Sequence, residues 1–113
     1  TSTSFVDTQL SVAITPKFAN SKILVQMVMN TQSPAGNRGE SKIVRGSTSL
    51  SSISWIGPND SHETWGATAG TWEDLPNTTS AITYKVQSKA LGGRFYYHSG
   101  GCISSLVLTE IKV

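Results

Sequence analysis

Residues 21–30, SKILVQMVMN, form the stretch from which the fold of this chain can be read. Successive side chains of an extended chain point to opposite faces, so one face of this stretch holds only apolar residues: Ile23, Val25, Met27 and Met29. The opposite face is half apolar and comprises Lys22, Leu24, Gln26, Val28 and Asn30. We therefore predict a strand in the middle of the fold, packed on a core by its first face and partly covered on its second.

Further strands are predicted on both sides of this stretch. Before it, residues 5–6 begin a short strand that residues 7–8 interrupt, and residues 9–15 then alternate cleanly up to Pro16. Beyond it, we predict strands over residues 40–46, 50–56, 81–87, 94–98 and 104–113. The side chains expected to face inward on the clearest of these strands are Leu10, Val12, Ile14, Ile82, Tyr84 and Val86. Turn signals about every ten residues predict an all-β chain without helices, folded as an antiparallel, jelly-roll-like β-sandwich.

The composition limits the size of the chain and the partners that it can have. Its 113 residues fit a single domain, residues 1–113. The nine Lys and Arg residues are scattered singly and the formal net charge is +2, so the basic stripe of a nucleic-acid-binding protein is missing. No apolar run approaches the roughly 20 residues of a membrane-spanning helix. The chain starts with TSTSFVDT, without Met or a signal-peptide pattern, so we expect it to be either a processed product or the cut-out end of a longer polypeptide, and we take it as the C-terminal piece.

The character of the sequence changes over residues 57–79, GPNDSHETWGATAGTWEDLPNTT. This span is predicted to be a loop with at most one short strand near residues 63–67. It combines Trp side chains with carboxylates, an imidazole and an amide, and this combination suits sugars, which have an apolar C–H face and hydroxyl groups. The alternative is that each Trp fills the core or an interface. The candidate ligand-binding residues are Asn59, His62, Glu63, Trp65, Trp72, Glu73 and Asp74.

Catalytic and metal-binding patterns are weak in this sequence. Glycoside hydrolysis needs two carboxyl groups beside the scissile bond, and only Glu63 with Glu73 or Asp74 offers such a cluster. The two histidines show no metal-ligand spacing, and no nucleophile elbow of the G-x-S-x-G kind occurs. We therefore expect no catalytic residues, no metal and no cofactor.

The last predicted strand suggests an oligomer because both of its faces are partly apolar. Leu106 and Leu108 share one face, whereas Val107, Ile111 and Val113 share the other. A subunit interface or a neighbouring part of the parent chain would cover the face that is turned away from the core, and the alternative is a long loop folded over it. The lone Cys102 excludes an intrachain disulfide, and oligomerisation is another common source of stability. The candidate interface residues are Leu106, Leu108 and Tyr96.

Several segments resemble a module of bacteriophage tail fibre and related virion proteins. They are FVDTQLSVAITP at residues 5–16, SKILV at 21–25, IVRGS at 43–47, TSAITYKVQ at 79–87 and SSLVLTEI at 104–111. These segments span nearly the whole chain, but they are scaffold strands without chemistry. The variable part of such modules corresponds to residues 57–76. The resemblance implies a trimeric β-sandwich at or near the end of a fibre, exposed for contact with a bacterial surface.

Together these observations favour a non-enzymatic receptor-binding module at the tip of a phage tail fibre. Its expected partners are two further copies of itself, an upstream fibre shaft, and a bacterial surface glycan or outer-membrane protein. Neither nucleic acid nor membrane insertion is expected, and the expected location is the virion. Two alternatives stay open: a structural trimerisation or capsid-surface domain without a specific ligand, and a monomeric carbohydrate-binding module of an extracellular enzyme.

Overall fold

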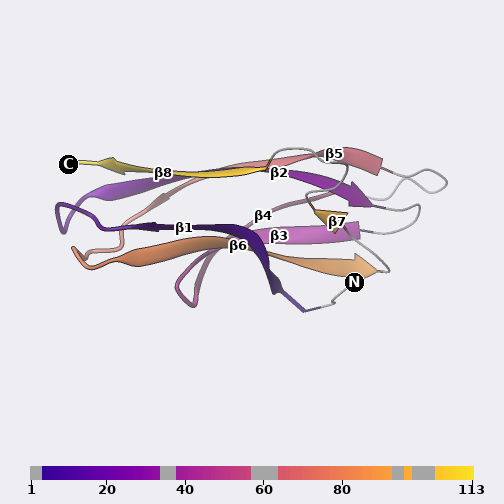
Figure 1. Ribbon diagram of the computed structural model, residues 1–113, viewed down its shortest axis with the longest axis horizontal. Coiled ribbons are helices and arrows are strands. Elements are labelled where there is room, and N and C mark those ends of the chain that lie inside the picture. Colours follow the sequence, from indigo (N-terminus) through magenta and orange to yellow (C-terminus); the bar gives the residue numbers. More distant parts are fainter. Residues whose placement is uncertain (1–3, 34–37, 57–63, 93–95, 98–103) are drawn as a thin grey trace.

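Two antiparallel sheets stack face to face in an elongated molecule measuring 50 × 23 × 19 Å (Figure 1). The computed structural model describes residues 4–33, 38–56, 64–92, 96–97 and 104–113. These residues form no helix, and hence none that could cross a membrane. Their strands are β1 (Val6–Ile14), β2 (Lys22–Ser33), β3 (Arg38–Arg45), β4 (Thr48–Ile56), β5 (Thr64–Asp74), β6 (Ile82–Gly92), β7 (Tyr96–Tyr97) and β8 (Ser105–Ile111). The prediction of an all-β chain with antiparallel sheets is confirmed.

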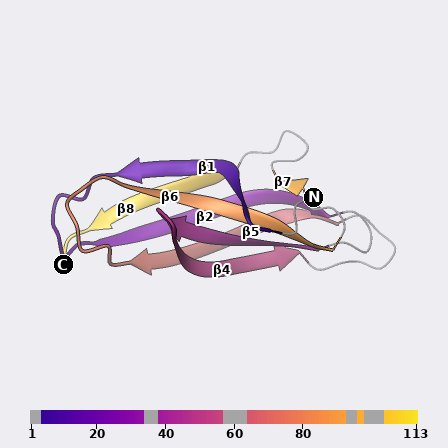
Figure 2. The same ribbon diagram turned by 90° about the horizontal axis from the view of Figure 1, so that it is seen from below.

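The first sheet has the strand order β1-β6-β3-β4, and the second has β2 between β5 on one side and β7 and β8 on the other. Strands of both sheets run along the long axis of the molecule (Figure 2). β1 and β8 lie together along one long side of the sandwich, and β4 and β5 lie along the other. The stretch at residues 21–30 is therefore central to its sheet, as its sequence predicts.

The core lies between the two sheets and is built by alternate residues. Ile23, Val25, Met27 and Met29 of β2 are all buried, in agreement with the predicted apolar face. Tyr84 and Val86 of β6 are buried opposite them, and the predicted inward residues Leu10, Val12, Ile14 and Ile82 pack against this cluster. On the second face of β2, Lys22 and Leu24 are half-buried whereas Gln26 and Val28 are exposed, so among the side chains described there the predicted partial cover is found in the first part of the strand.

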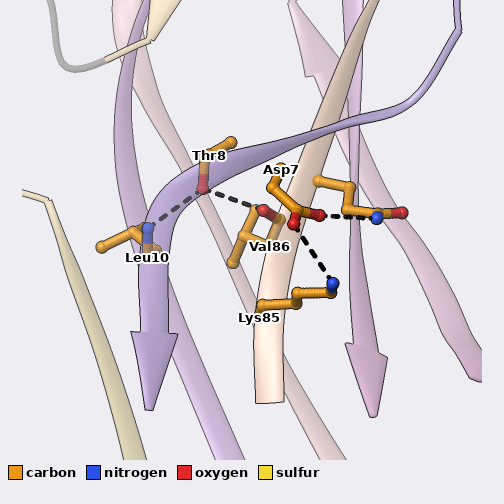
Figure 3. A network of polar contacts seen from close by, with 6 residues as sticks. Asp7, Thr8, Leu10, Lys85 and Val86 are labelled. Carbon is orange, nitrogen blue, oxygen red and sulfur yellow. Dashed lines mark hydrogen bonds and ion pairs between the residues drawn. The ribbon is translucent and has the colours of Figure 1, made fainter. Parts of the chain in front are cut away.

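The start of the chain also differs from the prediction. Residues 7–8 do not interrupt a strand, because β1 runs from Val6 and the irregularity is a register shift between Asp7 and Ser11. Thr8 makes this shift possible by replacing ladder hydrogen bonds with side-chain ones: its Oγ1 donates to the Val86 carbonyl at 2.9 Å and accepts from the Leu10 amide at 3.1 Å (Figure 3). The hydroxyl thus keeps the bulge hydrogen-bonded.

The turn between β3 and β4 falls where the sequence predicts it. Gly46 has a φ of 58°, in the left-handed region that favours glycine, and its amide donates to the Thr83 carbonyl at 2.9 Å. This bond ties the turn to the beginning of β6. It also fixes the position of Arg45, the last residue of β3.

Candidate functional site

The prediction of a loop over most of residues 57–79 is wrong, because β5 occupies residues 64–74. It pairs with β2 without a register shift, from Ser33 opposite Thr64 to Ile23 opposite Asp74. The small residues at positions 66, 67, 69 and 70 conceal this strand in the sequence, since Gly and Ala carry little β preference. A long neighbouring strand with free hydrogen-bonding groups overrides that local preference.

β5 separates the two Trp residues that the sequence places in one loop. Trp65 lies opposite Gln32 and Trp72 lies opposite Val25, so their backbones are about 23 Å apart along the strand. Asn59, His62 and Glu63 lie outside the described residues, as does the side chain of Trp65. Of the aromatic candidates, Trp72 is the one whose side chain the structure describes.

Trp72 lies at the edge of its sheet, where β5 has β2 as its pairing partner among the described strands. It occupies the same face as buried Val25, yet 40% of its surface stays exposed. The neighbouring Glu73 faces outward with its side chain 60% exposed, and its Oε2 is 3.8 Å from the Nζ of Lys22. The edge of β5 thus presents a partly exposed indole on its inner face and a carboxylate with an ammonium group on its outer face, and groups of these kinds contact C–H faces and hydroxyls of sugars.

Asp74, also predicted to bind ligand, is buried and already satisfied within the protein. Its Oδ2 accepts hydrogen bonds from Arg45 Nη1 and from the Tyr84 hydroxyl, both at 2.6 Å. Burial first, and the hydrogen bond to Asp74 second, raise the pKa of Tyr84 above its ordinary value. Because Arg45 and Tyr84 belong to the first sheet and Asp74 to the second, these bonds join the two layers.

The candidate interface residues of β8 face the core. Leu106 belongs to the buried cluster and Leu108 packs against it, whereas the side chain of Tyr96 lies outside what the structure describes. The exposed apolar side chains at this strand and just beyond it are Val107, Ile111 and Val113. Any contact through the outer face of β8 would therefore use this second set. Cys102 also lies outside the described residues.

Sequence reasoning missed a polar cluster on the outer face of the first sheet. The carboxylate of Asp7, in β1, accepts a hydrogen bond from the side-chain amide of Gln87 at 2.8 Å, and its Oδ2 lies 3.2 Å from the Nζ of Lys85 (Figure 3). The hydrogen bond from Gln87, followed by that from Lys85, lowers the pKa of Asp7. Farther along this face, the Phe5 ring lies beside the ammonium groups of Lys42 and Lys89. No sequence motif indicates this cluster, because the residues of β6 in it lie 78 to 84 positions after those of the β1 segment with which they meet. Its remaining member, Lys42, belongs to β3.

A second missed feature is the tie between β8 and the connection that precedes β2. The Lys17 amide donates to both carboxylate oxygens of Glu110, at 3.0 and 2.9 Å, and the Phe18 amide donates to Oε2 at 3.1 Å. These bonds, that of Lys17 above all, lower the pKa of Glu110. Glu110 is therefore a structural residue that holds the connection against β8.

The comparisons with known proteins add no relative. The chain matches no protein-family model, and searches of curated proteins and of solved structures give no match either.

Proposed function

We propose that this chain is a non-enzymatic receptor-binding module of a bacteriophage tail fibre tip, located in the virion, which acts as a homotrimer and binds a bacterial surface glycan. The observation that carries the proposal is the partly exposed side chain of Trp72 at the β5 edge, on a strand whose opposite face carries Glu73 paired with Lys22. The segments that resemble fibre modules support it, since they contain β1 and β8 and parts of β2, β3 and β6 of the scaffold. The jelly-roll-like connectivity and the trimer are parts of this proposal, as is an upstream fibre shaft as partner.

The pairing of Asp74 supports a binding role rather than hydrolysis. A glycosidase needs a carboxylic acid with a raised pKa that can reach the glycosidic oxygen. Asp74 instead faces Arg45 and Tyr84 inside the sandwich, and Glu73 is exposed beside Lys22. Glu73 is therefore suited to contact a ligand, whereas Asp74 is suited to hold the two sheets together.

The test is binding of the fluorescently labelled domain to a panel of bacterial strains, measured by flow cytometry. Trp72→Ala is expected to abolish staining of the strains that the wild-type domain stains, with an unchanged circular-dichroism spectrum. Phe18→Ala is the matched control, because this ring is equally exposed (42%) but lies in the connection between β1 and β2. Equal staining by wild type and Trp72→Ala, or no stained strain at all, would refute the proposal.

A purely structural role in trimerisation is the second candidate, and the outer face of the second sheet favours it. Val28, Val107 and Ile111 are exposed there on adjacent strands, and the central positions Gln26, Thr71 and Thr109 carry no charge. A neutral, partly aliphatic face meets no like-charge repulsion when copies associate. Val107→Lys should then lower the mass measured by light scattering, whereas Thr83→Lys, on the outer face of the first sheet, should leave it unchanged. A wild-type domain that is monomeric at all concentrations would contradict this candidate.

A further inference from the structure

The outer face of the first sheet holds two lysines that converge on one aromatic ring. The Nζ of Lys42 lies 4.2 Å from the centroid of the Phe5 ring, and the Nζ of Lys89 lies 4.6 Å from it. The two ammonium groups are therefore no more than about 9 Å apart, within one Debye length at moderate salt. We call these three residues the Phe5 patch.

Strand pairing fixes the positions of these lysines. Lys42 of β3 lies opposite Gln87 of β6, and Lys89 lies two residues farther along β6, opposite Glu40. Both lysines are half-buried, which limits the freedom of their side chains. Phe5, just before β1, extends the same face beyond Asp7, which lies opposite Gln87.

Within the described part of the chain, two other lysines form ion pairs with carboxylates, whereas the lysines of the patch do not. Lys85 pairs with Asp7 at 3.2 Å and Lys22 with Glu73 at 3.8 Å. Among the described residues no ion pair includes Lys42 or Lys89; Lys42 donates to the Ser49 hydroxyl at 2.9 Å and otherwise contacts the ring. Each ammonium has three N–H donors, so both retain donors for an external anion. The contact with the ring partly offsets the repulsion between them.

We propose that the Phe5 patch binds an acidic polysaccharide, with Lys42 and Lys89 holding a carboxylate or phosphate group of one sugar unit. Hydrogen bonds from two ammonium groups to one anionic group are charge-assisted and stronger than neutral ones. Phe5 packs on the apolar face of the sugar ring. The oxygen of the Gln87 side chain and the Asp7 carboxylate accept hydrogen bonds from sugar hydroxyls.

The neighbouring carboxylates favour a sparsely charged sugar polymer over a nucleic acid. Asp7 and Glu40 lie on the same face as Lys42, Lys85 and Lys89, so the face has only a small positive excess. Dense phosphates along a nucleic-acid strand would meet these carboxylates, whereas nucleic-acid-binding surfaces offer a continuous basic stripe. A sugar chain offers hydroxyl groups to the same carboxylates.

This inference rests on the proposed receptor-binding function and deepens it, because it names the class of glycan. The patch is separate from Trp72, since it lies on the outer face of the first sheet and Trp72 lies at the edge of the second. The two sites can therefore be tested with different variants and different readouts.

The experiment measures binding of the purified domain to polygalacturonate, which carries carboxylates, and to phosphomannan, which carries phosphates. Neutral mannan serves as the uncharged sugar polymer, and oligothymidylate serves as a polyanion with few free hydroxyl groups. The variant is Lys42→Gln with Lys89→Gln, and its matched control is Lys17→Gln with Lys112→Gln, which removes the same charge away from the patch. Phe5→Leu tests the ring while keeping an apolar side chain.

At least one acidic polysaccharide should bind, and the Lys42/Lys89 variant should weaken that binding about tenfold or more. The Lys17/Lys112 control should bind like wild type, Phe5→Leu should bind more weakly, and mannan should not bind. The polymer that binds identifies the anion as carboxylate or phosphate. Absence of binding to both acidic polymers, equal losses in the two double variants, or tighter binding of oligothymidylate would overturn the proposal. If the wild-type domain binds neither polymer but the Lys42/Lys89 variant loses cell staining, the proposed receptor-binding function stands. The proposal that the patch binds an acidic polysaccharide is then refuted.

The Trp72→Ala variant separates the two proposals. It should retain polymer binding through the Phe5 patch. If polymer binding persists but wild-type protein stains no bacterial strain, the patch stands and the fibre-tip function falls.

Discussion

Arg45 and Asp74 join the two sheets of the sandwich, because the Nη1 atom of Arg45 on β3 donates to Oδ2 of Asp74 on β5 at a distance of 2.6 Å. The carboxylate side chain is almost fully buried, and the guanidinium is about three-quarters buried. The Tyr84 hydroxyl donates to the same oxygen. A buried carboxylate with two strong donors is thus the polar anchor between layers that are otherwise held by apolar packing.

Removing the carboxylate charge should destabilise the domain strongly. Asp74→Asn leaves Arg45 partly buried without its counter-charge, and we expect a loss of about 3 kcal/mol in the free energy of unfolding. Urea denaturation at a fixed protein concentration measures this loss. The control is Glu73→Gln, which removes the adjacent exposed carboxylate and should change stability by less than about 0.5 kcal/mol. Similar effects of the two substitutions would show that Asp74 is not the anchor.

The phenol of Tyr84 should make stability fall at alkaline pH. Its pKa is raised above the ordinary value of 10.0 in the folded state, chiefly by burial, so the unfolded chain loses this proton first as the pH rises. The contribution is fully present below pH 10 and should decrease above it by up to about 1.4 kcal/mol per pH unit. Denaturation curves of wild type and Tyr84→Phe from about pH 9 to about pH 11 should diverge, the wild type losing more stability. Parallel curves would contradict the assignment.

Glu110 should titrate at an unusually low pH. The amides of Lys17 and Phe18 stabilise its ionised form, which lowers the pKa below the ordinary value of 4.5. Its contribution to stability is therefore present above pH 4.5 and is lost as the pH falls through the lowered pKa. In an NMR titration, the amide signals of residues 17 and 18 should shift with a midpoint below 4.5. Glu110→Gln should abolish this pH-dependent change of the amide signals. A midpoint at or above pH 4.5 would contradict the hydrogen bonds between Glu110 and these amides.

The strands of the core could be predicted from the sequence because alternation is a local signal. The alternation of Ile23, Val25 and Met27 predicts β2 from the local sequence alone. Tyr84 and Val86 predict β6 in the same way. β5 could not be recognised because its Gly and Ala residues have no such pattern. Its conformation depends on pairing with β2, a stretch about 40 residues earlier in the chain.

The candidate site was only partly predictable for a related reason. Trp72 is 40% exposed, whereas Asp74, two residues later in the same strand, is buried and paired inside the sandwich. The sequence does not show that Arg45 and Tyr84 converge on Asp74 from the other sheet. The Phe5 patch is hidden in the same way, since Phe5, Lys42 and Lys89 become neighbours only through the order β1-β6-β3.

The two faces of β2 should respond differently to the same substitution. Val25 is fully buried, so Val25→Ala should lower the free energy of unfolding by about 2 kcal/mol through lost packing and a cavity. Val28 is 41% exposed on the opposite face, so Val28→Ala should cost less than about 1 kcal/mol. Urea denaturation of both variants at low protein concentration measures these costs. Equal costs would contradict the assignment of Val25 to the core face of β2 and of Val28 to its outer face.

The same pair of variants also reports on contact between copies. If the outer face of β2 and β8 is covered by another copy, the cost of Val28→Ala should grow as the protein concentration rises, because association stabilises the folded state by mass action. The cost of Val25→Ala should not change with protein concentration, since its side chain lies in the core of each copy. A cost of Val28→Ala that is independent of concentration, together with an unchanged mass, would argue against the structural candidate and leave ligand binding as the function to pursue.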